Sequence, residues 1–163
     1  MWAWIKAILL LPVMALIVLP AITLYLTHYH LQPIAPIRLI LAILLFCTGG
    51  ALALWTMYLF ATKGHGTAAP WDPPKRLVIQ GPYCYVRNPM ITSILLLLLG
   101  EYVLLQSTAL LIWLGIFLIV NMIYFPLVEE KSLEKRFGQD YILYKQNVPR
   151  WIPRLTPWDL PSS

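Results

Sequence analysis

Two polar segments of this sequence contain residues whose types and spacing are suited to binding a charged ligand. The first runs from Lys63 to Asn88, and Arg87, Asn88 and Pro89 stand at its end. Asn is a favoured N-cap residue and Pro a favoured first helical residue, so we predict that a helix begins at Pro89. The free backbone N–H groups at such a start, beside Arg87, favour an anionic ligand group. The alternative is that Asn88 only caps the helix.

The second segment begins with two adjacent carboxylates, Glu129 and Glu130. A long apolar run ends just before them, which places them toward the C-terminal half of a helix, where the helix dipole disfavours negative charge. We therefore expect them either to pair with Lys or Arg side chains or to bind a cationic ligand. The sequence alone favours ion pairing.

Apolar and aromatic residues follow these carboxylates at the spacing of one face of a helix. Basic side chains occupy much of the remaining surface, a pattern that predicts an amphipathic helix on an anionic membrane surface. Gly138 is the expected point of interruption. The residues of the stripe are Leu133, Phe137, Tyr141, Tyr144 and Val148.

The composition of the chain indicates which elements hold these segments. Of its 163 residues, 60% are hydrophobic and only 12% are charged, with a mean hydropathy of +0.71. Soluble domains carry about 25% charged residues, so this chain has too few to cover a water-soluble surface. These values exclude a soluble globular domain, a disordered chain and a disulfide-stapled secreted module. They leave an integral membrane protein, in which we expect Cys47 and Cys84 to be free thiols.

Four apolar stretches are candidates to cross a bilayer core about 30 Å thick, which takes about 20 residues per helix. Almost no loop separates the last two, so we predict that they form a tight antiparallel hairpin with Glu101 near its closed end. We therefore predict an all-α integral membrane protein with four transmembrane helices in a single domain, 1–163. The predicted spans are 7–26, 39–62, 89–105 and 107–128, with a loop at 63–88 and a C-terminal segment at 129–163.

The basic residues predict the orientation of this multi-pass protein. Lys and Arg number 12 and Asp and Glu number 7. One basic residue precedes the first span, four lie between the second and third, and six follow the fourth, whereas only Arg38 falls on the other side. Because Lys and Arg collect in cytoplasmic loops, we expect both termini and both polar segments on the cytoplasmic side, in a cell inner membrane. The basic excess thus reflects membrane topology, and we expect no nucleic-acid partner.

Both polar segments resemble a known family of membrane enzymes. Residues 81–90, GPYCYVRNPM, resemble the GPYRYVRHPMY motif of the isoprenylcysteine carboxyl methyltransferase and phospholipid N-methyltransferase group. Residues 129–150 are similar to the same family's tail, EE-x2-L-x3-FG-x2-Y-x2-Y-x3-VPR. The resemblance extends over residues 64–154, and its two ordered motifs are separated by the predicted hairpin.

The resemblance implies a cofactor, S-adenosylmethionine, bound on the cytoplasmic side. In that family the loop before the hairpin, the hairpin's first turn and an acidic residue at the hairpin's end hold the cofactor. The loop and the C-terminal amphipathic helix would therefore form the cofactor site, with no metal. Carried across by position, the resemblance implies cofactor contacts from Leu77, Val78, Tyr83, Asn88, Pro89, Met90, Ile91 and Glu129, and catalytic roles for Arg87, Glu129 and Glu130.

This sequence departs from the family's motifs at three positions. The family's usual His is Asn88, which can donate and accept hydrogen bonds but cannot act as a base near neutral pH. The Tyr that often follows the Met is Ile91. Phe125 stands near the place where prenylcysteine enzymes carry an arginine, which disfavours a prenylcysteine carboxylate as the substrate.

These residues predict a methyltransferase that acts on a lipid or other hydrophobic acceptor, by carboxylate O-methylation or amine N-methylation. The alternative is a non-catalytic membrane scaffold that retains the fold, for which Asn88 and Ile91 are the sequence support. A metal protein using His28 and His30 is a weaker alternative, because these two residues lack acidic or thiol partners. The sequence does not define the acceptor or the oligomeric state.

Overall fold

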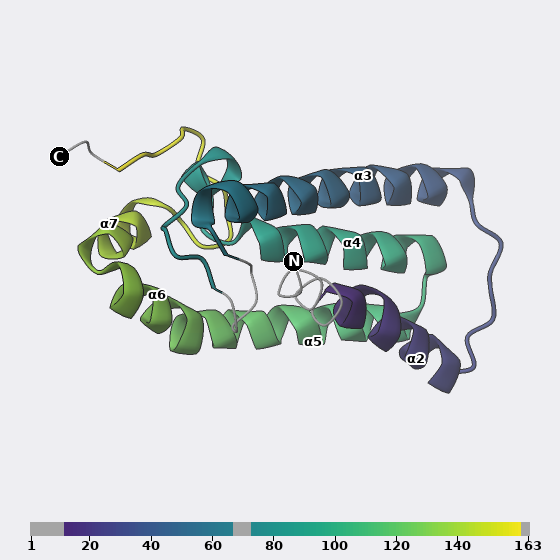
Figure 1. The fold of residues 1–163 in the computed structure, drawn as a ribbon. Coiled ribbons are helices and arrows are strands. Elements are labelled where there is room, and N and C mark those ends of the chain that lie inside the picture. Colours follow the sequence, from purple (N-terminus) through teal and green to yellow (C-terminus); the bar gives the residue numbers. More distant parts are fainter. Residues whose placement is uncertain (1–11, 67–72, 161–163) are drawn as a thin grey trace.

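The computed structural model describes residues 12–66 and 73–160. Within these residues the secondary structure is helical, with no strand (Figure 1). The beginning of the first predicted span, residues 7–11, lies outside them. The elements are η1 (Met14–Val18), α2 (Leu19–Leu26), α3 (Pro36–Leu59), η2 (Phe60–Gly64), η3 (Gly81–Cys84), α4 (Pro89–Leu105), α5 (Thr108–Tyr124), η4 (Phe125–Glu129), α6 (Glu130–Phe137) and α7 (Gln139–Asn147).

Within residues 12–66 and 73–160, two continuous helices are long and apolar enough to cross a membrane, Pro36–Gly64 and Thr108–Phe137. The other apolar helices, Met14–Leu26 and Pro89–Leu105, are shorter. The second long helix stays apolar only as far as Val128. Because about 20 helical residues cross the bilayer core, we expect Glu129 and the turns after it to lie beyond that core. Two spans are thus supported, and the count of four stays a prediction.

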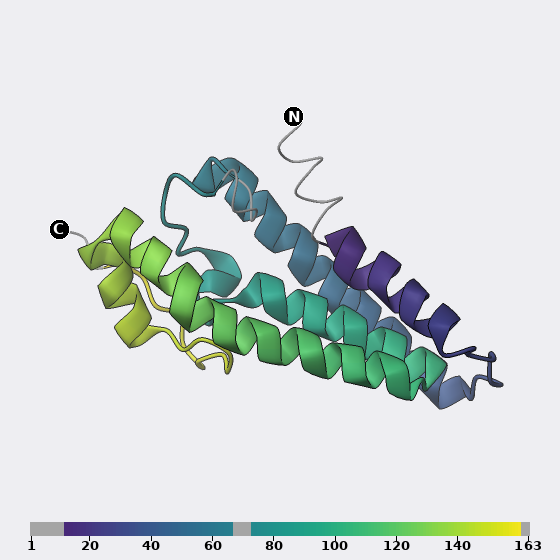
Figure 2. The same ribbon diagram turned by 90° about the horizontal axis from the view of Figure 1, so that it is seen from below.

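Helix α4 lies between α3 and α5 in both views (Figures 1 and 2). Close packing of α3 on α4 depends on Gly49, because a Cβ atom at that position would lie 3.0 Å from the carbonyl oxygen of Ser93. Small residues allow helices to approach in this way. Only Gln106 and Ser107 join α4 to α5, and Gln106 turns the chain with a φ of +53°.

The helix boundaries follow the proline and glycine signals in the sequence. Helix α4 begins at Pro89, as predicted, with Asn88 at the N-cap position. Helix α3 begins at Pro36, three residues before the predicted start, because this proline also suits the first turn of a helix. Gly138, with a φ of +56°, separates α6 from α7. The predicted interruption at this glycine is confirmed.

The stripe of apolar residues in α6 and α7 packs against protein, in contrast to the membrane surface that we predicted for it. Tyr141, Tyr144 and Val148 are buried and form one cluster with Ile79 and Cys84 of the loop. Leu133, Phe137, Trp158 and Leu160 are half-buried around the same cluster. The sequence pattern identified the buried face correctly, but it could not show which surface covers that face.

Gly81 is predicted to tolerate alanine poorly, because its backbone conformation and the space around it both disfavour a side chain. Its φ is +57°, and an added Cβ atom would lie 2.8 Å from Cζ2 of Trp55. We expect Gly81→Ala to lower the free energy of unfolding by about 1 to 3 kcal/mol, through backbone strain and this clash. Thermal unfolding in detergent measures the loss. Gly115→Ala is the control, because nothing lies within 4 Å of its Cβ position; a loss of the same size there would contradict the explanation.

Candidate active site

The loop before α4 packs between the end of α3 and helix α7. On one side, Val78 and Tyr83 pack against Leu59 and Phe60, and the rings of Tyr83 and Phe60 are stacked with their centroids 5.3 Å apart. On the other side, Ile79 and its neighbours belong to the cluster under α7. The alternation of apolar side chains along the loop thus fixes the loop between two helical surfaces.

Hydrogen bonds fasten the C-terminal segment to the same loop. The backbone N–H of Arg87 donates to the carbonyl oxygen of Pro149 at 2.9 Å, and the hydroxyl of Tyr144 donates to the carbonyl oxygen of Tyr83 at 2.7 Å. Two further backbone bonds join Arg154 to Tyr85 and Trp158 to Cys84. The two motifs that are distant in the sequence therefore form one unit at one end of the helices (Figure 1).

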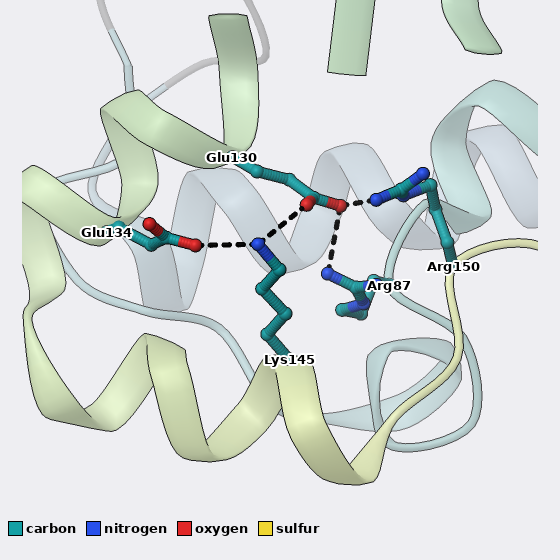
Figure 3. A network of polar contacts seen from close by, with 5 residues as sticks. All are labelled: Arg87, Glu130, Glu134, Lys145 and Arg150. Carbon is teal, nitrogen blue, oxygen red and sulfur yellow. Dashed lines mark hydrogen bonds and ion pairs between the residues drawn. The ribbon is translucent and has the colours of Figure 1, made fainter. Parts of the chain in front are cut away.

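Glu130 is the centre of a network of ion pairs within this unit (Figure 3). Its Oε1 atom lies 2.9 Å from Nη1 of Arg87 and 2.7 Å from Nε of Arg150. Its Oε2 atom lies 3.2 Å from Nζ of Lys145, which also lies 2.7 Å from Oε1 of Glu134. The side chain of Glu130 is 3% exposed and that of Arg87 is 9% exposed. One buried carboxylate thus connects the loop, α7 and the C-terminal segment.

The two adjacent glutamates have different surroundings. Burial alone would raise the pKa of Glu130, but the hydrogen bonds from Arg150 and Lys145 and the charges of Arg87 and Arg150 bring it below its ordinary value. Burial raises the pKa of Glu129, and the charge of Arg136 only partly offsets this. Glu129 makes no ion pair with any residue that the structure describes. The predicted ion pairing is therefore observed for Glu130.

Three buried polar atoms near the end of the loop lack a hydrogen-bond partner within the described residues. They are the Tyr83 hydroxyl, Nε of Arg87 and Nδ2 of Asn88. Although Asn88 is at the N-cap position, its side chain makes no capping hydrogen bond, so the alternative that it only caps α4 is not supported. A buried donor without a partner costs free energy. The three atoms are therefore suited to a ligand that offers hydrogen-bond acceptors.

The remaining predicted cofactor residues lie around this loop. Val78 and Pro89 are buried, whereas Leu77, Met90 and Ile91 are half-buried. A hollow of about 420 Å³ opens at the surface beside the start of the loop. Its lining residues are Lys63, Arg76, Leu77, Val78, Ile79, Gln80, Asp159 and Leu160.

Sequence reasoning did not assign Lys145, Arg150 or Glu134 to the site. Lys145 and Glu134 are on different helices, so no single helical period relates them. Arg150 belongs to the tail motif, and that was the one signal available for it. No group of three or more His, Cys, Asp or Glu residues that could hold a metal ion occurs in the described ranges.

Alkaline pH is predicted to destabilise the unit through Cys84. Burial, and then the charge and hydrogen bond of Asp159, raise the pKa of this thiol from 9.0 to about 11. Because the pKa is raised in the folded state, the neutral thiol contributes to the free energy of unfolding. This contribution is complete below pH 9 and is lost as the pH rises through 11. We expect the melting temperature of the wild type to fall toward that of Cys84→Ala over this interval. If the difference in melting temperature between the two proteins stayed constant over this pH interval, Cys84 would not be the cause of the alkaline destabilisation.

Comparison with known proteins identifies the family. A family model described as phospholipid methyltransferase matches residues 37–140, which cover more than half of the chain and include the loop, α4, α5 and the two adjacent glutamates. No curated protein and no solved structure gave a significant match. The motifs that suggested this relationship lie in the unit around Glu130. The chain belongs to the phospholipid methyltransferase family.

Proposed function

We propose that this membrane protein transfers a methyl group from S-adenosylmethionine to a lipid or other hydrophobic acceptor at the cytoplasmic face of the membrane. The family supports methyl transfer to lipid-related substrates. The observation that carries the choice of cofactor is the set of three buried donors without described partners, Tyr83, Arg87 and Asn88, within the family's motif.

The residues present fit the charges of the cofactor. S-adenosylmethionine has a carboxylate, an ammonium group and a sulfonium centre. The free donors of Arg87 and Asn88 would hold the carboxylate, since hydrogen bonds that involve an ionised group are the strong ones. Glu129 would face the positive charge, because Glu130 already accepts from three cations. The two glutamates would thus act differently, Glu129 toward the cofactor and Glu130 toward the protein.

The protein's own contribution would be alignment and the exclusion of water. When bound, S-adenosylmethionine supplies an electrophilic methyl group. Because the transfer is an in-line displacement, the orientation of the two reactants supplies much of the rate. The aromatic faces of Tyr83 and Tyr85 are suited to a nearby positive charge. A carboxylate acceptor needs no base, whereas an amine must first lose a proton, for which His65 is the nearest candidate.

The arrangement of the helices supports access for a hydrophobic acceptor from the membrane. The outer surfaces of α3 and α5 carry exposed apolar side chains, among them Leu44, Leu54, Ile112 and Ile119. Both polar segments lie at the same end of the helices (Figures 1 and 2). A lipid would then approach sideways between helices while the cofactor arrives from the cytoplasm.

Binding of the labelled cofactor to the purified protein in detergent tests the proposal. We expect the wild type to bind S-adenosylmethionine, and Glu129→Gln to bind it about tenfold more weakly, because one charged contact is lost. Asp140→Asn is the matched control, since Asp140 is exposed on α7. A wild type that binds no cofactor would favour the non-catalytic scaffold.

Membranes that contain the protein identify the acceptor. Incubation with methyl-labelled cofactor should transfer label to an extractable lipid or other hydrophobic species. Label that base releases as methanol would indicate a methyl ester, and label that resists base would indicate an N-methyl group. Cofactor binding without any labelled product would contradict methyl transfer to a hydrophobic acceptor.

A further inference from the structure

The segment between Pro149 and Trp158 carries two apolar side chains that the described residues leave almost uncovered. Ile152 is 80% exposed and Leu155 is 99% exposed. Both belong to the chain that follows α7, outside the helices that are expected to cross the membrane. Single exposed apolar residues are common on protein surfaces, so the position of this segment decides whether the two side chains have a partner.

Hydrogen bonds and prolines hold the segment in one place. Pro153 and Pro157 lie within it, and proline restricts the backbone. The segment is also bonded to the loop before α4 and to α7 at several points. Backbone bonds join Pro149 to Arg87, Arg154 to Tyr85 and Trp158 to Cys84, and the guanidinium of Arg154 donates to the carbonyl oxygen of Asn147. The exposed apolar side chains are therefore presented by a fixed loop and not by a free tail.

The contact between Trp151 and Phe125 shows at which level of the protein this segment lies. The two rings meet edge-on, with their centroids 6.1 Å apart. Phe125 belongs to the last apolar turn of the helix Thr108–Phe137, in which Leu127 and Val128 are also exposed. The chain after α7 thus turns back toward the end of α5 (Figures 1 and 2). The segment therefore lies where we expect the boundary of the membrane.

The polar groups of the segment are suited to the same boundary. Trp151 is half-buried, and tryptophan is enriched at membrane interfaces because its ring is apolar while its N–H group is polar. Arg154 makes no ion pair within the described residues. Its positive charge is therefore available to the phosphate groups of anionic lipids.

We propose that residues 151–155 form an interfacial anchor, which inserts Ile152 and Leu155 among the lipid head groups at this end of the protein. The partner is the membrane surface, and apolar burial together with the charge of Arg154 supplies the attraction. The anchor holds the unit around Glu130 against the membrane. The membrane contact that the sequence pattern predicted for α6 and α7 is thereby made by the segment that follows them.

Spin-label accessibility in lipid vesicles tests the anchor. The full-length protein carries Cys47→Ser, so that Thr156→Cys places one label beside the anchor while Cys84 stays buried. Asp140→Cys, on the exposed surface of α7, is the control site. Oxygen concentrates in lipid, whereas a charged nickel chelate stays in water. We expect the label at position 156 to collide mainly with oxygen and the label at position 140 to collide mainly with the nickel chelate.

A double variant tests the two apolar side chains themselves. Because Ile152 and Leu155 are exposed, Ile152→Ser/Leu155→Ser should fold. Removing one aliphatic side chain from lipid shifts the equilibrium between membrane and water by about tenfold or more. We therefore expect the nickel accessibility at position 156 to rise to the value at position 140. No change in the double variant would overturn the proposal.

Two further outcomes would also overturn the anchor. Equal nickel accessibility at positions 156 and 140 before the serine substitutions would place the segment in water. Low accessibility to both reagents at position 156 would mean that a second protein molecule covers the segment. None of these measurements uses the cofactor, so failure of the anchor is distinguishable from failure of the proposed function, which S-adenosylmethionine binding by the same samples decides.

Discussion

Glu130→Gln is expected to destabilise the protein more than any other single change in the network. The neutral amide cannot balance the positive charges of Arg87, Lys145 and Arg150. Arg87 would then be a buried cation without a counterion among the described residues. Removing one partner from a buried ion pair costs about 3 to 5 kcal/mol. Because Lys145 and Arg150 are partly exposed, we expect a loss at the lower end of this range.

The reactivity of Cys84 provides the measurement. Cys84 is buried and Cys47 is exposed; in a Cys47→Ser background, a thiol-reactive dye therefore reports the opening of the unit around Cys84 during heating. Glu134→Gln is the matched control, since Glu134 is 35% exposed and pairs only with Lys145 among the described residues. We expect it to cost less than about 1 kcal/mol. Similar melting temperatures for Glu130→Gln and Glu134→Gln would show that the network does not hold the unit together.

The sequence was sufficient to predict those features that depend on nearby residues. Pro89 and Gly138 determine where α4 begins and where the C-terminal helix is interrupted, and both predictions agree with the structure. The face of α6 and α7 that becomes buried was also predicted, because a helical period records it. The surface against which that face packs was not, because the partners Ile79 and Cys84 are distant in the sequence.

The different surroundings of Glu129 and Glu130 could not be predicted from spacing. The helix contains a π-turn, Phe125–Glu129, in which the backbone N–H of Glu130 donates to the carbonyl oxygen of Phe125. Pro126 lies within this turn, and proline cannot donate a backbone hydrogen bond. A π-turn takes more residues than an α-turn, so side chains after it point in directions that a period of 3.6 residues does not give. The position of Glu130 among three cations depends on this local irregularity and on segments far along the chain.

Arg87→Lys is expected to lower cofactor affinity with little effect on folding. A lysine ammonium keeps the positive charge next to Glu130, but it lacks the planar fork that places a second donor away from the ion pair. Together with Asn88, the Nε atom of Arg87 is the group that we expect to hold the cofactor's carboxylate. The loss of a hydrogen bond between charged groups lowers affinity by about ten- to a hundredfold.

Equilibrium dialysis with labelled S-adenosylmethionine measures this change, and the melting temperature of the same samples separates binding from folding. Arg38→Lys is the matched control, because Arg38 lies near the start of α3, at the opposite end of the helix from the loop (Figure 1). We expect Arg87→Lys to melt near the wild type while its affinity falls, and Arg38→Lys to change neither value. Wild-type affinity in Arg87→Lys would mean that the free Nε atom is not the cofactor's donor. Asn88 and Tyr83 carry the other two buried donors that lack a partner among the described residues, and they would then be the residues to test for that role.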